Sequence, residues 1–302
     1  MASKPLAPGV WGIVATPFSG STFDLDEGSL ARLVEHYEKI GVTGLTVLGV
    51  FGEAAKLSSV ERREVLETVV DTVDLPLVVG ATALATPPVI EEVERAMEVV
   101  GDQFAGAMVQ VNSADPETLT VHLRGIHEAT GAGIVVQDYP AASGVSIPTD
   151  RLVTALRDLD FVVAIKAESP PTALAVGTLT RDLPGIPVFG GLGGIGLIDE
   201  LAAGAAGAMT GFSVPEGLQA CVDAYQKGGY EAAVEAFQPY LPLVNFEQQP
   251  GIALAIRKEA LRRRGLLLES AVRPPGKSMP DILVPQLDTH LKHCAPTRTG
   301  LS

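Results

Sequence analysis

Lys166 follows a run of five apolar residues, Phe161 to Ile165, and Glu168 stands two positions further on. The apolar run predicts a buried strand. Because successive side chains alternate along a strand, Lys166 and Glu168 share one face of it. Burial disfavours the ammonium form of a lysine, and a neutral amine can attack a ketone to form a Schiff base. The pair therefore predicts either a nucleophilic lysine or a structural ion pair.

A lysine of this kind would react with the C2 ketone of a 2-keto acid. A Schiff base at C2 acidifies the protons on C3, so that an enamine forms when one of them is removed. The enamine can then expel a hydroxyl group from C4, or the C3–C4 bond can break. The expected substrate is a small 2-keto acid, the reaction is dehydration or aldol chemistry, and no cofactor and no metal are required.

The lysine-bearing strand is one of eight apolar segments that alternate with helix-like segments. The strands are predicted at residues 10–18, 44–49, 75–82, 104–111, 132–140, 161–166, 186–191 and 205–211. They are apolar throughout, as expected for a parallel sheet that is covered on both faces. Eight such units favour an α/β fold of the closed (β/α)8 TIM-barrel type over an open doubly wound sheet.

The chain beyond residue 230 has no predicted strand. Two of its segments, 230–244 and 250–265, have the apolar spacing of helices. We therefore expect a barrel formed by residues 1–229 and a C-terminal helical extension formed by residues 230–302.

Composition excludes several classes of function. A net charge of −14 makes the chain a poor nucleic-acid binder, because phosphate contacts need clustered lysine and arginine. No run of about 18 apolar residues is present, so we expect no membrane span. Cys221 and Cys294 are too few for a disulfide framework, and the first ten residues lack the apolar run of a signal peptide. These features favour a reducing, cytoplasmic location.

The active site of a (β/α)8 barrel lies at the carboxyl ends of its strands. The catalytic residues predicted there are Lys166, Gln137, Tyr139 and Glu168. The predicted substrate-binding residues are Thr16, Gly49, Val50, Phe51, Gly191 and Thr210.

Four segments carry a resemblance to a known family. They are “GIVATPF” (12–18), “LGVFGEAAKLS” (48–58), “VVAIKAES” (162–169) and “GAAGAMTG” (204–211). Over roughly its whole length the chain resembles the dihydrodipicolinate synthase / N-acetylneuraminate lyase family of Schiff-base lyases. The resemblance implies that Lys166 forms the Schiff base and that the protein is a homotetramer or homodimer.

The chain departs from the synthases of this family at the positions that relay protons. Gln137 stands where they have a tyrosine, and Val50 and Phe51 stand where they have two threonines. Residues 141–143 are Ala-Ala-Ser, where the synthases carry an arginine that holds a substrate carboxylate. These departures argue against synthase activity in lysine biosynthesis.

A second set of residues resembles the branch of the family that dehydrates 2-keto-3-deoxy-L-arabinonate. The set comprises Gln137-Asp138 with Pro140, Lys166-x-Glu168-Ser169-Pro170, residues 207–211 and “LPLVNFE” (241–247). This resemblance implies a Schiff-base lyase that dehydrates a 2-keto-3-deoxy sugar acid.

The implied mechanism gives each predicted residue a role. Lys166 forms the iminium, and Glu168 or a water held by Gln137 removes the C3 proton. Tyr139 is the candidate donor to the leaving hydroxyl group. Backbone N–H groups near Val50 and Phe51, together with the Thr210 hydroxyl, would hold the carboxylate. We expect Glu53 to brace its loop rather than take part in the chemistry.

Two alternative functions remain open. One is an aldolase, or an enzyme like dihydrodipicolinate synthase, that condenses or releases pyruvate. The other is a catalytically inactive keto-acid-binding protein, which the missing tyrosines motivate.

Two further motifs have plainer interpretations. Residues 191–196 spell G-x-G-x-x-G, but the next strand lacks the acidic residue of a dinucleotide site, so a tight turn is favoured. His290, His293 and Cys294 lie near the C-terminus and are interpreted as a frayed end rather than a metal site.

Overall fold

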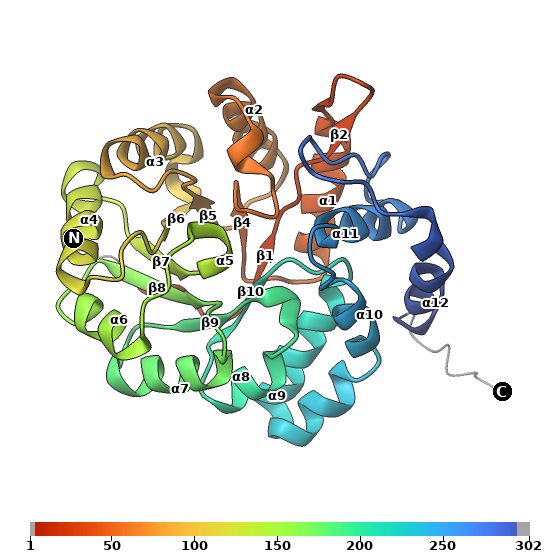
Figure 1. Cartoon of the computed structure of the whole chain (residues 1–302). Coiled ribbons are helices and arrows are strands. Elements are labelled where there is room, and N and C mark those ends of the chain that lie inside the picture. The colour runs from red at the N-terminus through yellow and green to blue at the C-terminus, as the bar shows by residue number, and fades with distance from the viewer. Residues whose placement is uncertain (1–3, 295–302) are drawn as a thin grey trace.

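The computed structural model describes residues 4–294, and its centre is a closed barrel of eight parallel strands (Figure 1). The strands pair in the order β1-β10-β9-β8-β7-β6-β5-β4. They are β1 (Gly9–Ile13), β4 (Gly44–Val47), β5 (Leu77–Gly80), β6 (Phe104–Gln110), β7 (Ile134–Asp138), β8 (Val162–Ala167), β9 (Val188–Gly190) and β10 (Gly207–Thr210). The predicted (β/α)8 barrel is therefore confirmed.

Helices follow the strands along the chain and surround the barrel (Figure 1). Local sequence sets where they begin: Ser58 and Glu61 form a reciprocal capping box at α2, and Pro116 opens α4. The helices are α1 (Glu27–Lys39), α2 (Ser59–Thr72), α3 (Thr86–Val100), α4 (Pro116–Thr130), α5 (Pro140–Ser143), α6 (Thr149–Leu156), α7 (Thr172–Asp182) and α8 (Leu197–Ala202).

The first strand is shorter than the predicted residues 10–18. β1 ends at Ile13, and β2 (Phe18–Ser19) pairs with β3 (Asp24–Leu25) in a two-stranded antiparallel sheet outside the barrel. Pro17 has no N–H group to donate, so a strand ladder cannot continue through it. Thr16 and Phe18 are nevertheless buried, which is why the apolar pattern runs past the end of the strand.

Large apolar side chains fill the inside of the barrel. Trp11, Met108, Phe189 and Met209 come from four different strands and belong to one buried cluster. Two larger clusters pack between the strands and the surrounding helices. Removal of this apolar surface from water supplies most of the driving force for folding.

The C-terminal part of the chain is helical, as predicted, and lies on one side of the barrel next to α1 (Figure 1). A hydrogen bond from Leu268 N to Ser29 Oγ (3.0 Å) ties it to that helix. The division at residues 229 and 230 stays a prediction; α9 crosses it, with non-helical backbone at Gly229 (φ 73°). The helices are α9 (Pro215–Phe237), α10 (Leu241–Phe246), α11 (Ala253–Arg263) and α12 (Val284–Cys294).

The prediction of a frayed end at residues 290–294 is wrong. These residues belong to α12, where the His290 ring packs 4.8 Å from the Phe246 ring and Cys294 is buried. Apolar contacts with α10 therefore order the segment. Within residues 4–294, no three histidine, cysteine, aspartate or glutamate side chains gather closely enough to hold a metal ion. None of the helices in this range combines the length and apolar character that crossing a membrane requires.

The closure between β1 and β10 predicts the effect of one substitution. Gly207 pairs with Gly9, has φ 150°, and a Cβ there would lie 1.9 Å from the Gly9 carbonyl oxygen. We expect Gly207→Ala to lower the free energy of unfolding by at least about 2 kcal/mol in urea titrations. Gly177→Ala on α7, where a Cβ meets nothing closer than 3.7 Å, is the control and should be neutral or slightly stabilising. Equal stability of the two variants would contradict the steric account of closure.

Candidate active site

A cavity of about 530 Å³ opens at the carboxyl ends of the barrel strands. Eight of the ten predicted site residues line it: Gly49, Val50, Phe51, Gln137, Tyr139, Lys166, Glu168 and Thr210. Thr16 and Gly191 are outside the lining. The structure thus brings residues from four strands and their loops to one place.

Lys166 and Glu168 form an ion pair inside this cavity. The Lys166 Nζ atom lies 3.0 Å from Glu168 Oε2, and the two side chains are 8% and 6% exposed. The Gln137 amide donates to the same oxygen (2.7 Å), since Gln137 on β7 is in register with Lys166 on β8. The other oxygen, Oε1, accepts a hydrogen bond from Leu192 N (3.1 Å). Glu168 is therefore held from three sides, with Lys166 at the cavity surface.

Gly191 lies against Glu168, and its contact with substrate stays a prediction. A Cβ at this position would lie 2.3 Å from Glu168 Cγ and 2.4 Å from Oε1. Glycine therefore leaves the space that the carboxylate of Glu168 occupies. The following residues form the predicted tight turn, η3 (Leu192–Gly194), in which Gly193 has φ 68°.

Thr210 and this turn are joined by one hydrogen bond. Gly193 N donates to Thr210 Oγ1 (2.6 Å), and both residues line the cavity. Because the hydroxyl oxygen accepts this bond, the hydroxyl proton stays available for a ligand.

The loop after β4 presents two backbone donors. Gly52 N and Glu53 N donate to Gly49 O and Val50 O (3.0 and 3.1 Å), whereas the N–H groups of Val50 and Phe51 have no acceptor within residues 4–294. Such a pair of adjacent N–H groups is suited to binding a carboxylate. Thr16, predicted to bind substrate, donates to Gly52 O (2.6 Å) and so fixes the path of this loop.

Glu53 braces the same loop, as expected from the sequence. It adopts left-handed backbone (φ 54°), and its buried carboxylate binds the amines of Lys258 (2.6 Å) and Lys56 (2.8 Å) and the backbone N–H of Arg273 (3.1 Å). Lys258 is fully buried, and this burial lowers the pKa of its amine to about 8, against the opposing effect of Glu53. The C-terminal helices are therefore bound to the loop that carries the free N–H groups.

Tyr139 lines the cavity from the start of α5. Burial, and to a lesser extent the charge of Glu168, raises the pKa of its phenol, while the charge of Arg257 lowers it. The phenol is thus protonated at neutral pH and able to donate a hydrogen bond. Asp138, next to it on β7, is buried, and burial together with the Glu168 charge raises its pKa to about 6.

Comparison with known proteins decides the family. The model of the dihydrodipicolinate synthetase family matches residues 7–294. The chain belongs to the dihydrodipicolinate synthetase family. It is accordingly a Schiff-base enzyme.

The relatives of this chain within the dihydrodipicolinate synthetase family include two kinds of enzyme. L-2-keto-3-deoxyarabonate dehydratase of Azospirillum brasilense is 30% identical over 293 residues, which are 93% of this chain and 91% of that protein. A 4-hydroxy-tetrahydrodipicolinate synthase of Methanothrix thermoacetophila is 31% identical over 245 residues, which are 78% and 80% of the two chains. The solved structure of dihydrodipicolinate synthase from Rhodopseudomonas palustris matches with a TM-score of 0.89 at 30% identity, covering 97% of this chain and 99% of that one.

Several lining residues of this family member were missed by the sequence analysis. Gln110 is the last residue of β6, and its buried Oε1 atom has no partner within residues 4–294. The strand-end rule that found Lys166 would have found it too. Gln248 and Arg257 reach the cavity from the C-terminal helices, and no sequence signal places those helices over the barrel. Lys56 and Thr82 also belong to this set.

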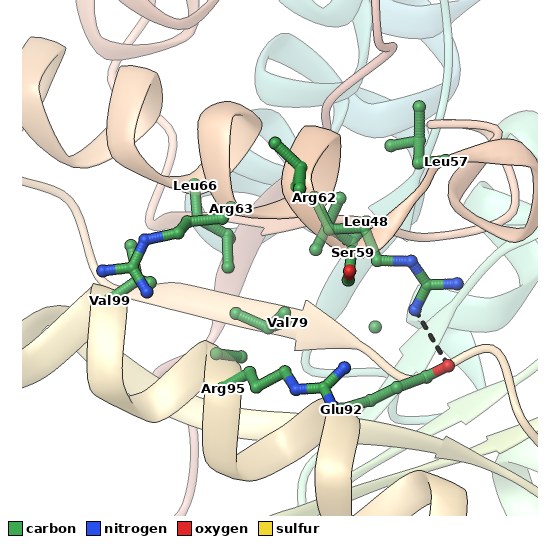
Figure 2. Close-up of a pocket in the computed structure, with 13 residues that line it drawn as sticks. Leu48, Leu57, Ser59, Arg62, Arg63, Leu66, Val79, Glu92, Arg95 and Val99 are labelled. Carbon is green, nitrogen blue, oxygen red and sulfur yellow. Dashed lines mark ion pairs between the residues drawn. The ribbon is translucent and has the colours of Figure 1, made fainter.

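A second cavity, of about 450 Å³, lies outside the barrel between α2 and α3 (Figure 2). Aliphatic residues of both helices and of β5 line it. At one end Arg62 pairs with Glu92 (2.8 Å), and Glu92 accepts hydrogen bonds from the N–H and hydroxyl of Thr82 (2.6 and 3.0 Å). Because Thr82 lines the first cavity, this outer ion pair positions part of the wall of the active site.

The Glu53 network predicts the effect of removing its buried cation. We expect Lys258→Met to lower the free energy of unfolding by about 3 kcal/mol or more, because a buried carboxylate loses a partner. Lys39→Met is the control: Lys39 is 73% exposed and pairs with Glu35 on the surface, so its loss should cost about 0.5 kcal/mol or less. Urea titration followed by circular dichroism measures both. A small effect at Lys258 would show that the pair contributes no net stability.

Glu200 on α8 predicts a pH dependence of stability. Burial, with the charges of Glu168 and Asp199, raises the pKa of its carboxyl from 4.5 to about 7. Between these values the folded chain binds more protons than the unfolded chain, so the free energy of unfolding falls as pH rises through this range.

We expect Glu200→Gln to remove the pH-dependent contribution of this carboxyl group to the free energy of unfolding. Stability should then decline less between about pH 5 and about pH 8 than in the wild type. Urea titrations at several pH values measure the slope, and Glu98→Gln, on a side chain that is 68% exposed, is the control. A slope identical to that of the wild type would contradict the raised pKa.

Proposed function

We propose that this protein is a hydro-lyase that dehydrates a 2-keto-3-deoxy sugar acid, such as 2-keto-3-deoxy-L-arabinonate, through an iminium on Lys166. The observation that carries the proposal is the Lys166–Glu168 pair, with its 3.0 Å separation, at the surface of the cavity. An amine with an adjacent, anchored carboxylate has both the nucleophile and the base that the reaction requires.

Dehydration is favoured over synthase chemistry by the residues around this pair. Gln137 stands where the synthases have a relay tyrosine, and its amide is occupied by Glu168 (2.7 Å). The dehydratase of Azospirillum brasilense matches a larger share of the chain, 93%, than the synthase of Methanothrix thermoacetophila, 78%. Both facts support dehydration over synthase chemistry, which relays protons through a chain of hydroxyl groups.

The first step is formation of the iminium. Lys166 passes a proton to Glu168 as its amine adds to the C2 carbonyl, and that proton then goes to the carbinolamine hydroxyl, which leaves as water. The free N–H groups of Val50 and Phe51, together with the Thr210 hydroxyl, are proposed to hold the C1 carboxylate. These donors are neutral, so none of them competes with Lys166 for the carboxylate of Glu168.

The second step is loss of water across C3 and C4. Glu168 is proposed to take the C3 proton, giving the enamine, whose electron pair expels the C4 oxygen. Tyr139 is proposed to protonate that oxygen, so that it leaves as water and the proton taken by Glu168 restores the phenol. Tautomerisation and hydrolysis of the iminium then release a keto acid lighter by one water and regenerate the amine.

Borohydride reduction tests the Schiff base. With pyruvate or 2-keto-3-deoxy-L-arabinonate, intact-mass spectrometry should show one reduced adduct on the wild type and none on Lys166→Ala. Lys56→Ala is the matched control, since Lys56 is the other lysine that lines the cavity, and its adduct should persist. An adduct on Lys166→Ala, or none on the wild type, would refute the assignment.

Product analysis distinguishes the proposed dehydration from the alternatives. From 2-keto-3-deoxy-L-arabinonate we expect a five-carbon keto acid that has lost one water. Pyruvate with a two-carbon aldehyde would instead identify an aldolase. Iminium formation without any product would identify a keto-acid-binding protein.

A further inference from the structure

Two polar side chains from the C-terminal part of the chain reach the cavity but have no part in the steps above. Arg257 comes from α11, and Gln248 follows α10; both line the cavity with Lys166. Each is half-buried, so each gives up part of its hydration in the folded chain. A side chain of this kind needs either a structural partner or a ligand.

Arg257 is held in one orientation by a single partner. Its Nε atom donates to Glu247 (3.0 Å), which is fully buried and also accepts the hydroxyl of Ser213. The guanidinium carbon lies 5.8 Å from the centre of the Phe51 ring. Within residues 4–294 the two terminal nitrogens, Nη1 and Nη2, have no protein acceptor. The ion pair with Glu247 therefore fixes the guanidinium and leaves its outer N–H groups unused.

Gln248 lies beside these free groups. Its Nε2 atom donates to Leu192 O (2.8 Å). A Cβ at Gly193 would lie 2.2 Å from that nitrogen and 2.6 Å from Arg257 Nη2. Both side chains are therefore packed directly on the turn after β9, where glycine leaves room for them.

The same turn connects these side chains to the lysine. Leu192 donates its N–H to Glu168 and accepts the Gln248 amide at its carbonyl. Glu168 in turn pairs with Lys166. Tyr139 is near enough to both ends that its phenol is affected by the Glu168 charge and by the Arg257 charge. The reacting amine and the free guanidinium nitrogens are thus on either side of one short turn in a shared cavity.

We propose that Arg257, with Gln248, forms the subsite for the oxygen-bearing end of the substrate, the carbons beyond C3. This inference rests on the proposed Schiff-base function of Lys166. Hydroxyl or carboxylate oxygens there would accept charge-assisted hydrogen bonds from Nη1 and Nη2. Pyruvate ends at C3 and carries no such oxygens. Arg257 accordingly favours binding of long hydroxylated 2-keto acids over pyruvate, whereas Lys166 can form a Schiff base with either.

The test compares substrates with and without these oxygens. Because Glu247 is fully buried, Arg257→Met is made together with Glu247→Gln, so that no unpaired charge remains. Arg257→Lys keeps the positive charge but removes the two terminal nitrogens, Nη1 and Nη2. Arg262→Met is the control on the same helix, since the Arg262 side chain is 40% exposed and pairs with Glu259. Borohydride trapping is measured with pyruvate and with 2-oxopentanoate, a five-carbon keto acid without hydroxyl groups.

We expect both Arg257 variants to trap pyruvate and 2-oxopentanoate as the wild type does. Their KM for 2-keto-3-deoxy-L-arabinonate should rise about ten- to a hundredfold, the factor expected for loss of a charged hydrogen bond. The control variant should match the wild type in every assay. Parallel loss of trapping with both pyruvate and 2-oxopentanoate, or an unchanged KM, would overturn the subsite. Failure of the wild type to trap any keto acid would instead overturn the Schiff-base function, and the subsite with it.

Discussion

Glu168 is the group on which the arrangement of the site depends. Its carboxylate binds the Lys166 amine from β8, an amide from the neighbouring strand β7 and a backbone N–H from the turn after β9. A buried amine without this counter-charge would be strongly unfavourable. The same carboxylate therefore makes the charged lysine tolerable, sets its position and fixes one wall of the cavity. Gly191 completes the arrangement, because any side chain there would take the space of the carboxylate.

Two more buried carboxylates near the cavity are paired with a cation, and both of these cations belong to α11. Glu53 binds Lys258, and Glu247 binds Arg257. In the first pair the carboxylate belongs to a loop of the barrel and the cation to the extension; in the second, both groups belong to the extension. The Glu53–Lys258 pair fixes the loop that carries the free N–H groups. The Glu247–Arg257 pair fixes the guanidinium that lines the cavity. The energetic cost of burying these charges is offset by their mutual contacts and hydrogen bonds.

The sequence was sufficient for the barrel and for the residues at its strand ends. Apolar runs with β-branched residues marked all eight strands, and the alternation of side chains placed Lys166 and Glu168 on one face. Gln137 and Thr210 followed from the same rule. Thr16 and Gly191 lie outside the cavity lining, because their neighbours in space, Gly52 and Glu168, belong to other parts of the chain. Arg257 and Gln248 were missed for a related reason: helical periodicity describes a helix but not where it docks.

The contribution of α11 to both pairs has a consequence for how the protein is made. The eight strands leave the ribosome before residues 247–273, so a nascent chain can assemble its barrel first. At that stage the carboxylate of Glu53 lacks Lys258, its loop is untethered, and the cavity has no guanidinium. The amine of Lys166 then lies in an unfinished cavity. Docking of the last helices is therefore the step that completes the cavity around Lys166, and with it the proposed subsite at Arg257.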